Sequence, residues 1–456
     1  MADWLAPALA YIPQWVAHQR RLTEMPGIAV AVAQGGKLVL DQAFGVANLA
    51  SGEALTPKHL FRVASHSKTF TAVGIMRLLE AGRLRLDDAA GQHVPGLHPE
   101  VAKATIAQLL SHTAGIVRDG DDTGQWADRR PFLNEAELRA ALALPPVIPA
   151  NTRMKYSNHA FGLAGLVIAA VTGEGYNAWI AREVVKKAGL ENTHPDTPVP
   201  AKVKTSRGHS SKWALGERLV IPADNCTHAL ASATGFLSTA GDLARFYATL
   251  DPAAPKSLLS AASRREMTRK QWPVPDTAGD RHYGLGTIHG RVGDWDMYGH
   301  SGGFQGVRTQ TATIPSQKLT VSVLTNAADG NPALLLEGVV HILRAFAKHG
   351  APGKAVAGWT GRWWSLWDAV DLVPMGDTVF VAVPGQANPF ADVSELKVTG
   401  PDEAVIRKAG GFGSHGEPAR LVRGRGGKVA SVVMAGGRLV DEAAIGKELR
   451  ARYAAG

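Results

Sequence analysis

The segment Ser65-His66-Ser67-Lys68 leads directly into an apolar run and is the most informative part of this 456-residue chain. If Ser65 opens a helix, Lys68 stands one turn further along the same face, where its amine can reach the serine hydroxyl. A serine hydroxyl is a weak nucleophile until a neighbouring base accepts its proton. A lysine can be that base when burial or nearby positive charge lowers its pKa. The spacing therefore predicts a nucleophilic serine with a lysine partner.

The same Ser-x-x-Lys pattern recurs at Ser394-Glu395-Leu396-Lys397, where the neighbouring residues predict a strand. Residues three apart on a strand point to opposite faces, so we interpret this second copy as a chance match. Ser65 could also be an ordinary helix N-cap, because serine fills that position well. The choice between nucleophile and cap therefore depends on companion motifs.

Two companion motifs follow in the chain. Tyr156-Ser157-Asn158 is the only Tyr-x-Asn in the sequence and precedes an apolar run at residues 161–171, which predicts a loop at a helix start. Its alternative is a turn in which Asn158 caps that helix. His300-Ser301-Gly302-Gly303 follows a predicted strand edge, and its glycines would let a substrate backbone approach closely. Its alternative is a glycine-rich hairpin, but three motifs in this order favour a catalytic site.

With these motifs the chain resembles the serine β-lactamase-like hydrolases, which include class C β-lactamases, DD-peptidases, D-aminopeptidases and related esterases. The resemblance covers about residues 20 to 347, and further matching segments are Phe61-Arg62-Val63-Ala64, Leu109-Leu110-Ser111-His112-Thr113-Ala114-Gly115 and Val323-Leu324-Thr325-Asn326. Class C β-lactamases carry Lys-Thr-Gly at the third motif, where this chain has His300-Ser301-Gly302. This departure favours the D-aminopeptidase and broader peptidase or esterase branches over a dedicated β-lactamase.

The resemblance implies a hydrolase that cleaves amide or ester bonds through an acyl-enzyme on Ser65. Lys68 and Tyr156 would share the proton transfers, and which of them takes the serine proton stays open. The family places Tyr156 opposite the nucleophile, which favours it as the acid for the leaving group. Asn158 would orient Lys68 and hold the substrate amide.

The third motif would complete the site. Backbone N–H groups of Ser65 and Gly303 would form the oxyanion hole by analogy with the family. His300 is expected to hydrogen-bond near Tyr156 or the substrate, beside Ser301 and Gly302. We expect a peptidase or amidase, with D-amino-acid specificity as one form. The alternatives are a short-chain carboxylesterase, a β-lactamase, a penicillin-recognising sensor that acylates without efficient turnover, and a binding module built on the C-terminal region.

One further motif competes with Ser65. Gly299-His300-Ser301-Gly302-Gly303 also fits Gly-x-Ser-x-Gly, the nucleophile elbow of α/β-hydrolases, which needs a helix directly after the serine. Residues 307–313 instead alternate like a strand. Asp329 and His341 follow in the order of a triad, but only twelve residues apart. We therefore favour Ser65.

The predicted fold is α/β, with an antiparallel sheet flanked by helices plus an all-helical subdomain, of the β-lactamase/transpeptidase type. We expect this domain at residues 1–349 and a small antiparallel β-barrel at 358–456. Gly361-Arg362-Trp363 resembles the Gly-x-Trp of the first lipocalin strand, and four tryptophans at 359–367 would fill the barrel core. The periodicity predicts helices at residues 4–23, 65–81, several between 104 and 250, and 332–348, and strands at 27–34, 37–46 and about 283–325.

Composition argues against several classes of binding partner and cofactor. The net charge of +9 is spread without basic runs, so we expect no nucleic-acid partner. A single cysteine and no zinc spacing predict neither a disulfide nor a metal, and we expect no cofactor. The acidic residues 119, 121 and 122 lack the rest of an EF-hand loop and predict a solvated turn.

No leader pattern opens the chain, and the longest apolar run, at residues 161–171, is too short to span a bilayer. We therefore expect a soluble cytoplasmic protein with no membrane partner. Its substrate would be a small peptide, amide or ester. The sequence is compatible with either a monomer or a homo-oligomer.

Overall fold

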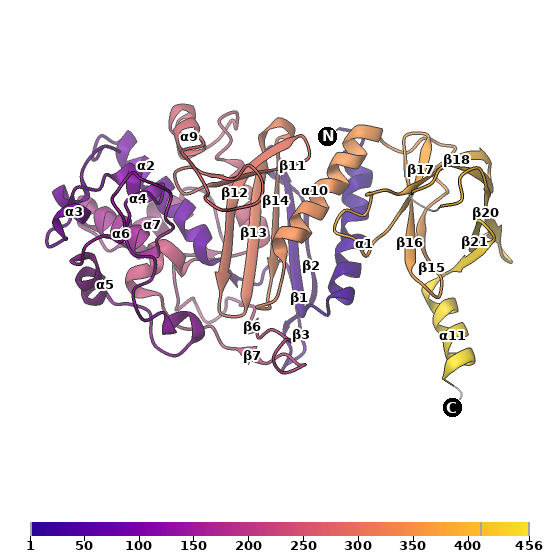
Figure 1. Ribbon diagram of the computed structural model, residues 1–456, viewed down its shortest axis with the longest axis horizontal. Helices are drawn as coiled ribbons and strands as arrows, with labels where there is room; N and C mark the ends of the chain where they lie inside the picture. The colour runs from indigo at the N-terminus through magenta and orange to yellow at the C-terminus, as the bar shows by residue number, and fades with distance from the viewer. Residues whose placement is uncertain (1, 411–412, 455–456) are drawn as a thin grey trace. The chain divides into compact units, whose positions relative to one another are not determined.

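The computed structural model describes residues 2–410 and 413–454 (Figure 1). By compactness the chain divides into two units, one of residues 24–336 and one that joins the residues up to Thr23 to those from Glu337 onward. The expected domains, residues 1–349 and 358–456, stay a prediction, because compactness does not show where an independently folding domain ends.

A nine-stranded antiparallel sheet forms the centre of the larger unit, in the order β3-β2-β1-β14-β13-β12-β11-β10-β9. Its first long strand pairs with its last, with Val30 opposite Val323. Both strands are almost wholly buried, which explains their continuous apolar sequences. The strands are β1 (Gly27–Gln34), β2 (Lys37–Asn48), β3 (Glu53–Ala54), β9 (Trp272–Pro273), β10 (His282–Tyr283), β11 (Ile288–Val292), β12 (Trp295–Phe304), β13 (Val307–Ile314) and β14 (Leu319–Thr325).

Helices from the middle of the chain gather beside this sheet (Figure 1). The helix α2 (Ser67–Glu80) is buried on nearly all sides, and Phe70 stacks on Phe236 and Phe246 at 4.3 and 4.0 Å between ring centroids. A helix that is buried on nearly all sides belongs to the core, so α2 is held firmly at the centre. The others are α3 (Pro99–Ala102), α4 (Ile106–Leu110), α5 (Glu135–Leu142), α6 (Asn158–Thr172), α7 (Tyr176–Ile180), α8 (Ala240–Ala248) and α9 (Ala261–Met267).

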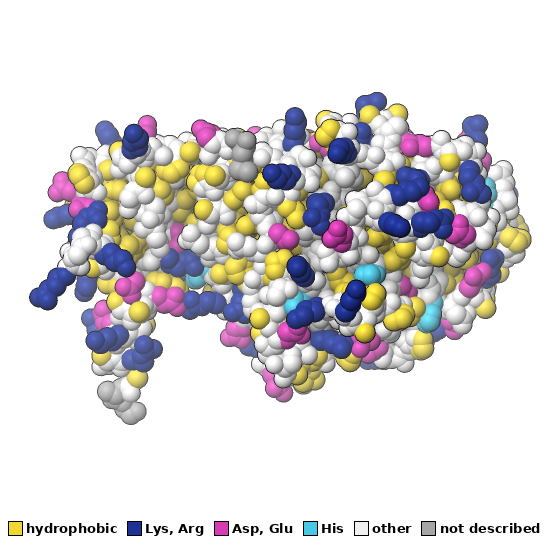
Figure 2. Space-filling view, turned by 180° about the vertical axis from the view of Figure 1, so that it is seen from behind, with side chains coloured by type: hydrophobic (Ala, Val, Ile, Leu, Met, Phe, Trp, Pro, Cys, Tyr) yellow, Lys and Arg dark blue, Asp and Glu magenta, His cyan; other side chains and the backbone are white. Residues whose placement is uncertain are grey.

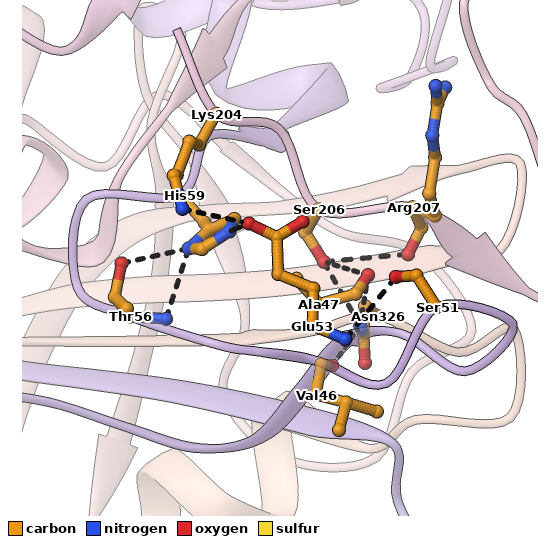
Figure 3. A network of polar contacts seen from close by, with 10 residues as sticks. All are labelled: Val46, Ala47, Ser51, Glu53, Thr56, His59, Lys204, Ser206, Arg207 and Asn326. Carbon is orange, nitrogen blue, oxygen red and sulfur yellow. Dashed lines mark hydrogen bonds and ion pairs between the residues drawn. The ribbon is translucent and has the colours of Figure 1, made fainter.

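Short strands and a polar network tie the irregular segments to the sheet. They are β4 (Phe61–Arg62), β5 (Thr193–His194), β6 (Gly208–His209), β7 (Val220–Ile221) and β8 (Leu237–Ser238). Asn326, directly after β14, donates from Nδ2 to the carbonyl of Val46 and the hydroxyl of Ser206, both at 3.0 Å (Figure 3). Glu53 bridges His59 and Lys204 in the same network. These contacts fix the segment around Ser206 without a regular ladder.

The predicted barrel is confirmed as a closed eight-stranded antiparallel barrel, completed where Trp364 of the first strand pairs with Val440 of the last. Trp359 and Trp363 lie in its core, but Trp367 is 91% exposed, so the expectation that all four tryptophans fill the core is wrong. The strands are β15 (Gly361–Trp364), β16 (Ala369–Met375), β17 (Thr378–Ala382), β18 (Ser394–Gly400), β19 (Glu403–Lys408), β20 (Pro418–Arg423), β21 (Val429–Met434) and β22 (Gly437–Val440).

The first helix, α1 (Leu5–Leu22), belongs to the same unit as the barrel. Tyr11 donates a hydrogen bond of 2.8 Å to the buried carboxylate of Asp371, which Arg362 also binds through two nitrogens. Trp15 lies so close to Gly338 of α10 (Pro332–His349) that a Cβ there would be 2.1 Å from the indole. The helix is therefore an integral part of this unit, as is α11 (Glu442–Tyr453).

The surface of the protein carries charged side chains of both signs. On the face in Figure 2, basic and acidic side chains are interspersed. Within residues 2–410 and 413–454, none of the helices combines the length and the apolar character that crossing a membrane requires.

Candidate active site

Ser65 lies in a 3₁₀ turn (Ala64–His66) directly before α2 and faces a cleft of about 640 Å³. Ala64 has a φ of 48°, a left-handed conformation that few residues other than glycine adopt. The hydroxyl of Ser67 donates to the Ala64 carbonyl at 2.5 Å and accepts from the Phe236 N–H at 3.0 Å. The regular helix thus begins two residues later than expected, and a braced turn presents Ser65 to the cleft.

Lys68 is completely buried beneath Ser65. Its Nζ lies 3.1 Å from Ser65 Oγ, 2.7 Å from Asn158 Oδ1 and 2.8 Å from the Ala233 carbonyl oxygen. Burial holds the pKa of Lys68 well below its usual value, against the opposing effect of Asp119. The surroundings therefore favour the neutral amine.

Tyr156 approaches Ser65 from another direction and donates a hydrogen bond of 2.8 Å to its Oγ. Its ring packs on His112, with 4.1 Å between the ring centroids. Burial raises the pKa of Tyr156 above its usual value, so the phenol keeps its proton at neutral pH. Ser65 thus stands between a phenol and an amine.

Asn158 connects Lys68 to an acidic residue behind it. The N-cap of α6 is Ser157, whose Oγ accepts from the Ala160 N–H at 2.9 Å, so the alternative in which Asn158 is the cap is wrong. The side chain of Asn158 is thereby available to the site: Oδ1 meets Lys68, and Nδ2 donates to Asp119 Oδ1 at 2.6 Å. The expected contact with Lys68 is present, while a role in holding substrate stays a prediction.

The solvated turn predicted for residues 119–122 is wrong for its first member. Asp119 is buried, accepts from Asn158 and pairs with Arg118 Nε at 3.0 Å, whereas Asp121 and Asp122 are exposed. An acidic cluster in a loop usually indicates solvated side chains, and nothing local distinguishes the carboxylate that turns inward. Sequence reasoning also missed the Ala233 carbonyl, because a backbone acceptor has no residue signature.

His112, in the segment of residues 109–115, shows what part of this segment does in the structure. It has a φ of 59°, its Nδ1 accepts from the Ser157 N–H at 3.1 Å, and its carbonyl accepts from the Lys155 N–H at 2.7 Å. Its ring also supports Tyr156. The segment therefore holds the Tyr156-Ser157-Asn158 loop in place.

The third motif lies on β12 at the opposite wall of the cleft. In the described ladders, β12 pairs with β13 as far as Phe304 but with β11 only as far as Gly299. The backbone of residues 300–303 therefore has one edge without a strand partner, and these residues line the cleft with Ser65. An extended substrate can add to such an edge.

His300 does not hydrogen-bond to Tyr156, because both ring nitrogens are engaged elsewhere, and its expected contact with the substrate stays a prediction. Nδ1 donates to the Ser301 carbonyl at 2.7 Å, and Nε2 accepts from the Tyr283 hydroxyl at 2.8 Å. Burial holds the pKa of His300 well below its usual value. The third motif thus contributes a neutral ring.

The two glycines of this motif differ. A Cβ at Gly302 would lie 2.2 Å from the Val63 carbonyl oxygen and 2.4 Å from Thr309 Oγ1, so this glycine is required by packing beside the turn of Ser65. At Gly303 no described atom lies within 4 Å of such a Cβ. Open space for a side chain is therefore present at Gly303 but not at Gly302, and the expected approach of a substrate backbone to both glycines stays a prediction.

The competing nucleophile elbow is wrong. Ser301 lies within β12 opposite Gln310, and the chain continues into β13 rather than a helix. Asp329 pairs with Arg218 instead of with a histidine. The second Ser-x-x-Lys, at Ser394–Lys397, lies along strand β18, where the serine and the lysine point to opposite faces, as predicted.

The chain is similar to known proteins in sequence and in fold. A family model described as Beta-lactamase matches residues 13–343. Penicillin-binding protein 4 of Amycolatopsis lactamdurans is 29% identical over 315 residues, which cover 66% of this chain and 81% of that protein. Protein flp of Staphylococcus aureus (strain COL) is 28% identical over 182 residues, which cover 39% of this chain but only 36% of that protein.

Solved structures share the architecture. The octameric penicillin-binding protein homologue from Pyrococcus abyssi has a TM-score of 0.67 at 21% identity, covering 95% of this chain and 99% of that chain. A D-stereospecific amidohydrolase from Streptomyces sp. has a TM-score of 0.61 at 25% identity, covering 72% and 97%. The D-amino acid amidase from Ochrobactrum anthropi SV3 has a TM-score of 0.62 at 20% identity, covering 75% and 98%. The predicted fold class is confirmed.

Proposed function

Because the chain belongs to the Beta-lactamase family of serine hydrolases, we propose that it is a peptidase or amidase that works through an acyl-enzyme on Ser65. One observation carries the proposal: Ser65 Oγ lies within 3.1 Å of a buried Lys68 amine and 2.8 Å of a Tyr156 phenol. This arrangement offers a base and an acid to one hydroxyl.

Hydrogen-bond capacity supports Lys68 as the base. A neutral amine has two N–H donors and one lone pair. The Asn158 amide oxygen and the Ala233 carbonyl oxygen can only accept, so they take both donors. The lone pair is left for the Ser65 hydroxyl, which gives up its proton to Lys68 as Oγ bonds to the substrate carbonyl carbon.

Tyr156 suits the opposite task. Its raised pKa makes it a poor base but keeps a proton available at neutral pH. When the carbon–nitrogen bond breaks, the leaving nitrogen takes the phenolic proton, and the Lys68 ammonium returns one to Tyr156. Backbone N–H groups of Ser65 and Gly303 would stabilise the oxyanion, and water then hydrolyses the Ser65 ester.

The preference for peptides and amides over lactams rests on His300. A lysine at this position would offer a permanent cation to the carboxylate of a lactam, whereas a buried, doubly hydrogen-bonded histidine is neutral. D-Amino-acid specificity is supported by the likeness to the D-stereospecific amidohydrolase at 25% identity. Esterase activity on short acyl esters is the second candidate, because esters need less help from the leaving-group acid.

A substrate panel tests the proposal. It comprises D- and L-aminoacyl anilides and amides, dipeptides, nitrophenyl esters and a chromogenic cephalosporin, each assayed with the wild type and with Ser65→Ala. We expect the highest kcat/KM for a D-aminoacyl amide or peptide, with many turnovers per enzyme. A cephalosporin as best substrate would establish a β-lactamase instead. Stoichiometric acylation without turnover on every compound would establish a sensor.

A further inference from the structure

A second cavity, of about 410 Å³, lies beside the loop of residues 119–122 in the larger unit. Its walls are mainly apolar and come from the segment from α3 to α6. Two rim side chains, Leu144 and Val147, are 60% and 59% exposed although they are large and hydrophobic. A concave apolar surface with exposed apolar side chains at its mouth is typical of a binding site for a small molecule.

The cavity has a polar group in its wall that lacks a partner. His159 is fully buried, and within the described residues neither of its ring nitrogens has a hydrogen-bond partner. A buried polar group without a partner costs free energy, so such a group needs an explanation. Gly120 passes over the ring, since a Cβ there would lie 3.6 Å from His159 Cε1. A larger residue at position 120 would narrow the way to the imidazole.

The charges around the cavity indicate a neutral ligand. The carboxylate of Asp119 is taken by Asn158 and Arg118, and that of Asp122 is taken by the Gly124 N–H and Arg130. Burial lowers the pKa of His159, so the ring offers one donor and one acceptor without a charge. The exposed carboxylate of Asp121 also lines the rim and disfavours an anionic head, while Arg130 lies there too and disfavours a cationic one.

We propose that this cavity binds a small neutral molecule that has an apolar body and one hydroxyl or amide head, with the head hydrogen-bonded to His159. The site is distinct from the catalytic cleft, because His159 lines only this cavity whereas its neighbour Asn158 lines only the cleft. Asp119 lines both. A bound molecule would therefore touch the loop that holds Asn158, and the site does not depend on which bond the enzyme cleaves.

The test uses two probes of equal shape, p-cresol and p-xylene, which differ by a hydroxyl in place of a methyl. Each is titrated into the full-length protein carrying labelled Ile, Leu and Val methyl groups. We expect p-cresol to shift, saturably, the methyl signals of residues that line the cavity, while Ile288 in the catalytic cleft stays unchanged. One hydrogen bond should make p-cresol bind about fivefold more tightly than p-xylene. The reporting side chains are Val101, Ile116, Leu133, Leu144 and Val147.

Three variants sharpen the test. Ala141→Phe fills the cavity and should abolish the shifts, whereas Ala143→Phe, two residues on and outside the lining, should leave them intact. His159→Phe should reduce p-cresol binding to the level of p-xylene. Equal binding of both probes to the wild type, shifts confined to Ile288, or unaltered p-cresol binding by Ala141→Phe would each overturn the proposal. The wild-type titration decides even if a variant fails to fold.

Discussion

The Nζ of Lys68 lies 2.7 Å from the side-chain oxygen of Asn158, a contact that joins two motifs ninety residues apart. The other end of the same amide donates to Asp119 at 2.6 Å. A carboxylate can only accept hydrogen bonds when ionised, so it fixes which end of the Asn158 amide faces Lys68. Asp119 is thereby a positioning residue that sets the acceptor around the proposed base.

The first prediction concerns this carboxylate. Asp119→Asn should move the acidic limb of the kcat/KM profile to lower pH. The proposed base works as the neutral amine, and activity is lost as pH falls through the pKa of Lys68. The charge of Asp119 raises that pKa, so its removal lowers it further. Initial rates across pH measure the limb. Asp122→Asn, in the same loop but exposed, is the control and should leave the limb in place. An upward movement in Asp119→Asn would contradict the assignment of Lys68.

The second prediction separates the two candidate serines. Ser65→Ala should lower kcat at least about a thousandfold, because it removes the attacking oxygen. Ser301→Ala should keep a measurable rate, since Ser301 lies within β12 opposite Gln310 rather than on a nucleophile elbow. Steady-state rates give the first comparison, and mass spectrometry after treatment with an active-site-directed phosphonate gives the second. A phosphonate adduct on Ser301 would refute the proposed nucleophile.

The third prediction uses the two neighbouring glycines of β12. Gly302→Ala should destabilise the protein by about 1–3 kcal/mol, because the added methyl meets a backbone oxygen and Thr309. Gly303→Ala should change stability by less than about 0.5 kcal/mol, since the space there is open. Its effect should instead be on KM for bulky substrates. Denaturant unfolding compares the two variants, and equal losses of stability would show that the packing beside Val63 is not the cause.

The fourth prediction concerns the barrel unit. Asp371→Ala should cost about 3–5 kcal/mol, because it leaves Arg362 and Tyr11 facing each other without their buried carboxylate. Asp402→Ala removes the partner of Arg423 at an exposed position and should leave stability almost unchanged. Guanidinium unfolding followed by tryptophan fluorescence distinguishes them. A similar small effect for both would mean that the buried pair adds little to this unit.

The local sequence pattern predicted the helices and strands well, but it predicted poorly which of them pack against one another. Strand β1 has the predicted bounds, Gly27–Gln34, and the barrel strands follow from alternating short segments between glycine turns. The sequence could not predict that α1 belongs to the barrel unit, because the apolar face of this helix is equally compatible with any apolar partner. Periodicity says that a face is buried but not against what.

The same limit applies to the candidate site, where the sequence predicts some contacts and not others. Four contacting residues of the site could be predicted, because their motifs are typical of one reaction and that reaction needs their side chains close together. These residues are Ser65, Lys68, Tyr156 and Asn158. The partners of His300 could not be predicted, since a histidine ring accepts or donates to many groups. Tyr283 meets it only through the pairing of β10 with β11 and of β11 with β12.

The pairing of α1 with the barrel also sets an order of events during synthesis. Tyr11 precedes Asp371 by 360 residues. At ribosomal rates of about 5–20 residues per second, the helix waits roughly 20 to 70 s for that partner. Trp15, buried in the finished protein, packs against Gly338, which is made only about 320 residues later. The nascent chain therefore carries this hydrophobic helix without its barrel partner until about four-fifths of the sequence has been made, and premature termination before Asp371 would leave the helix without that partner.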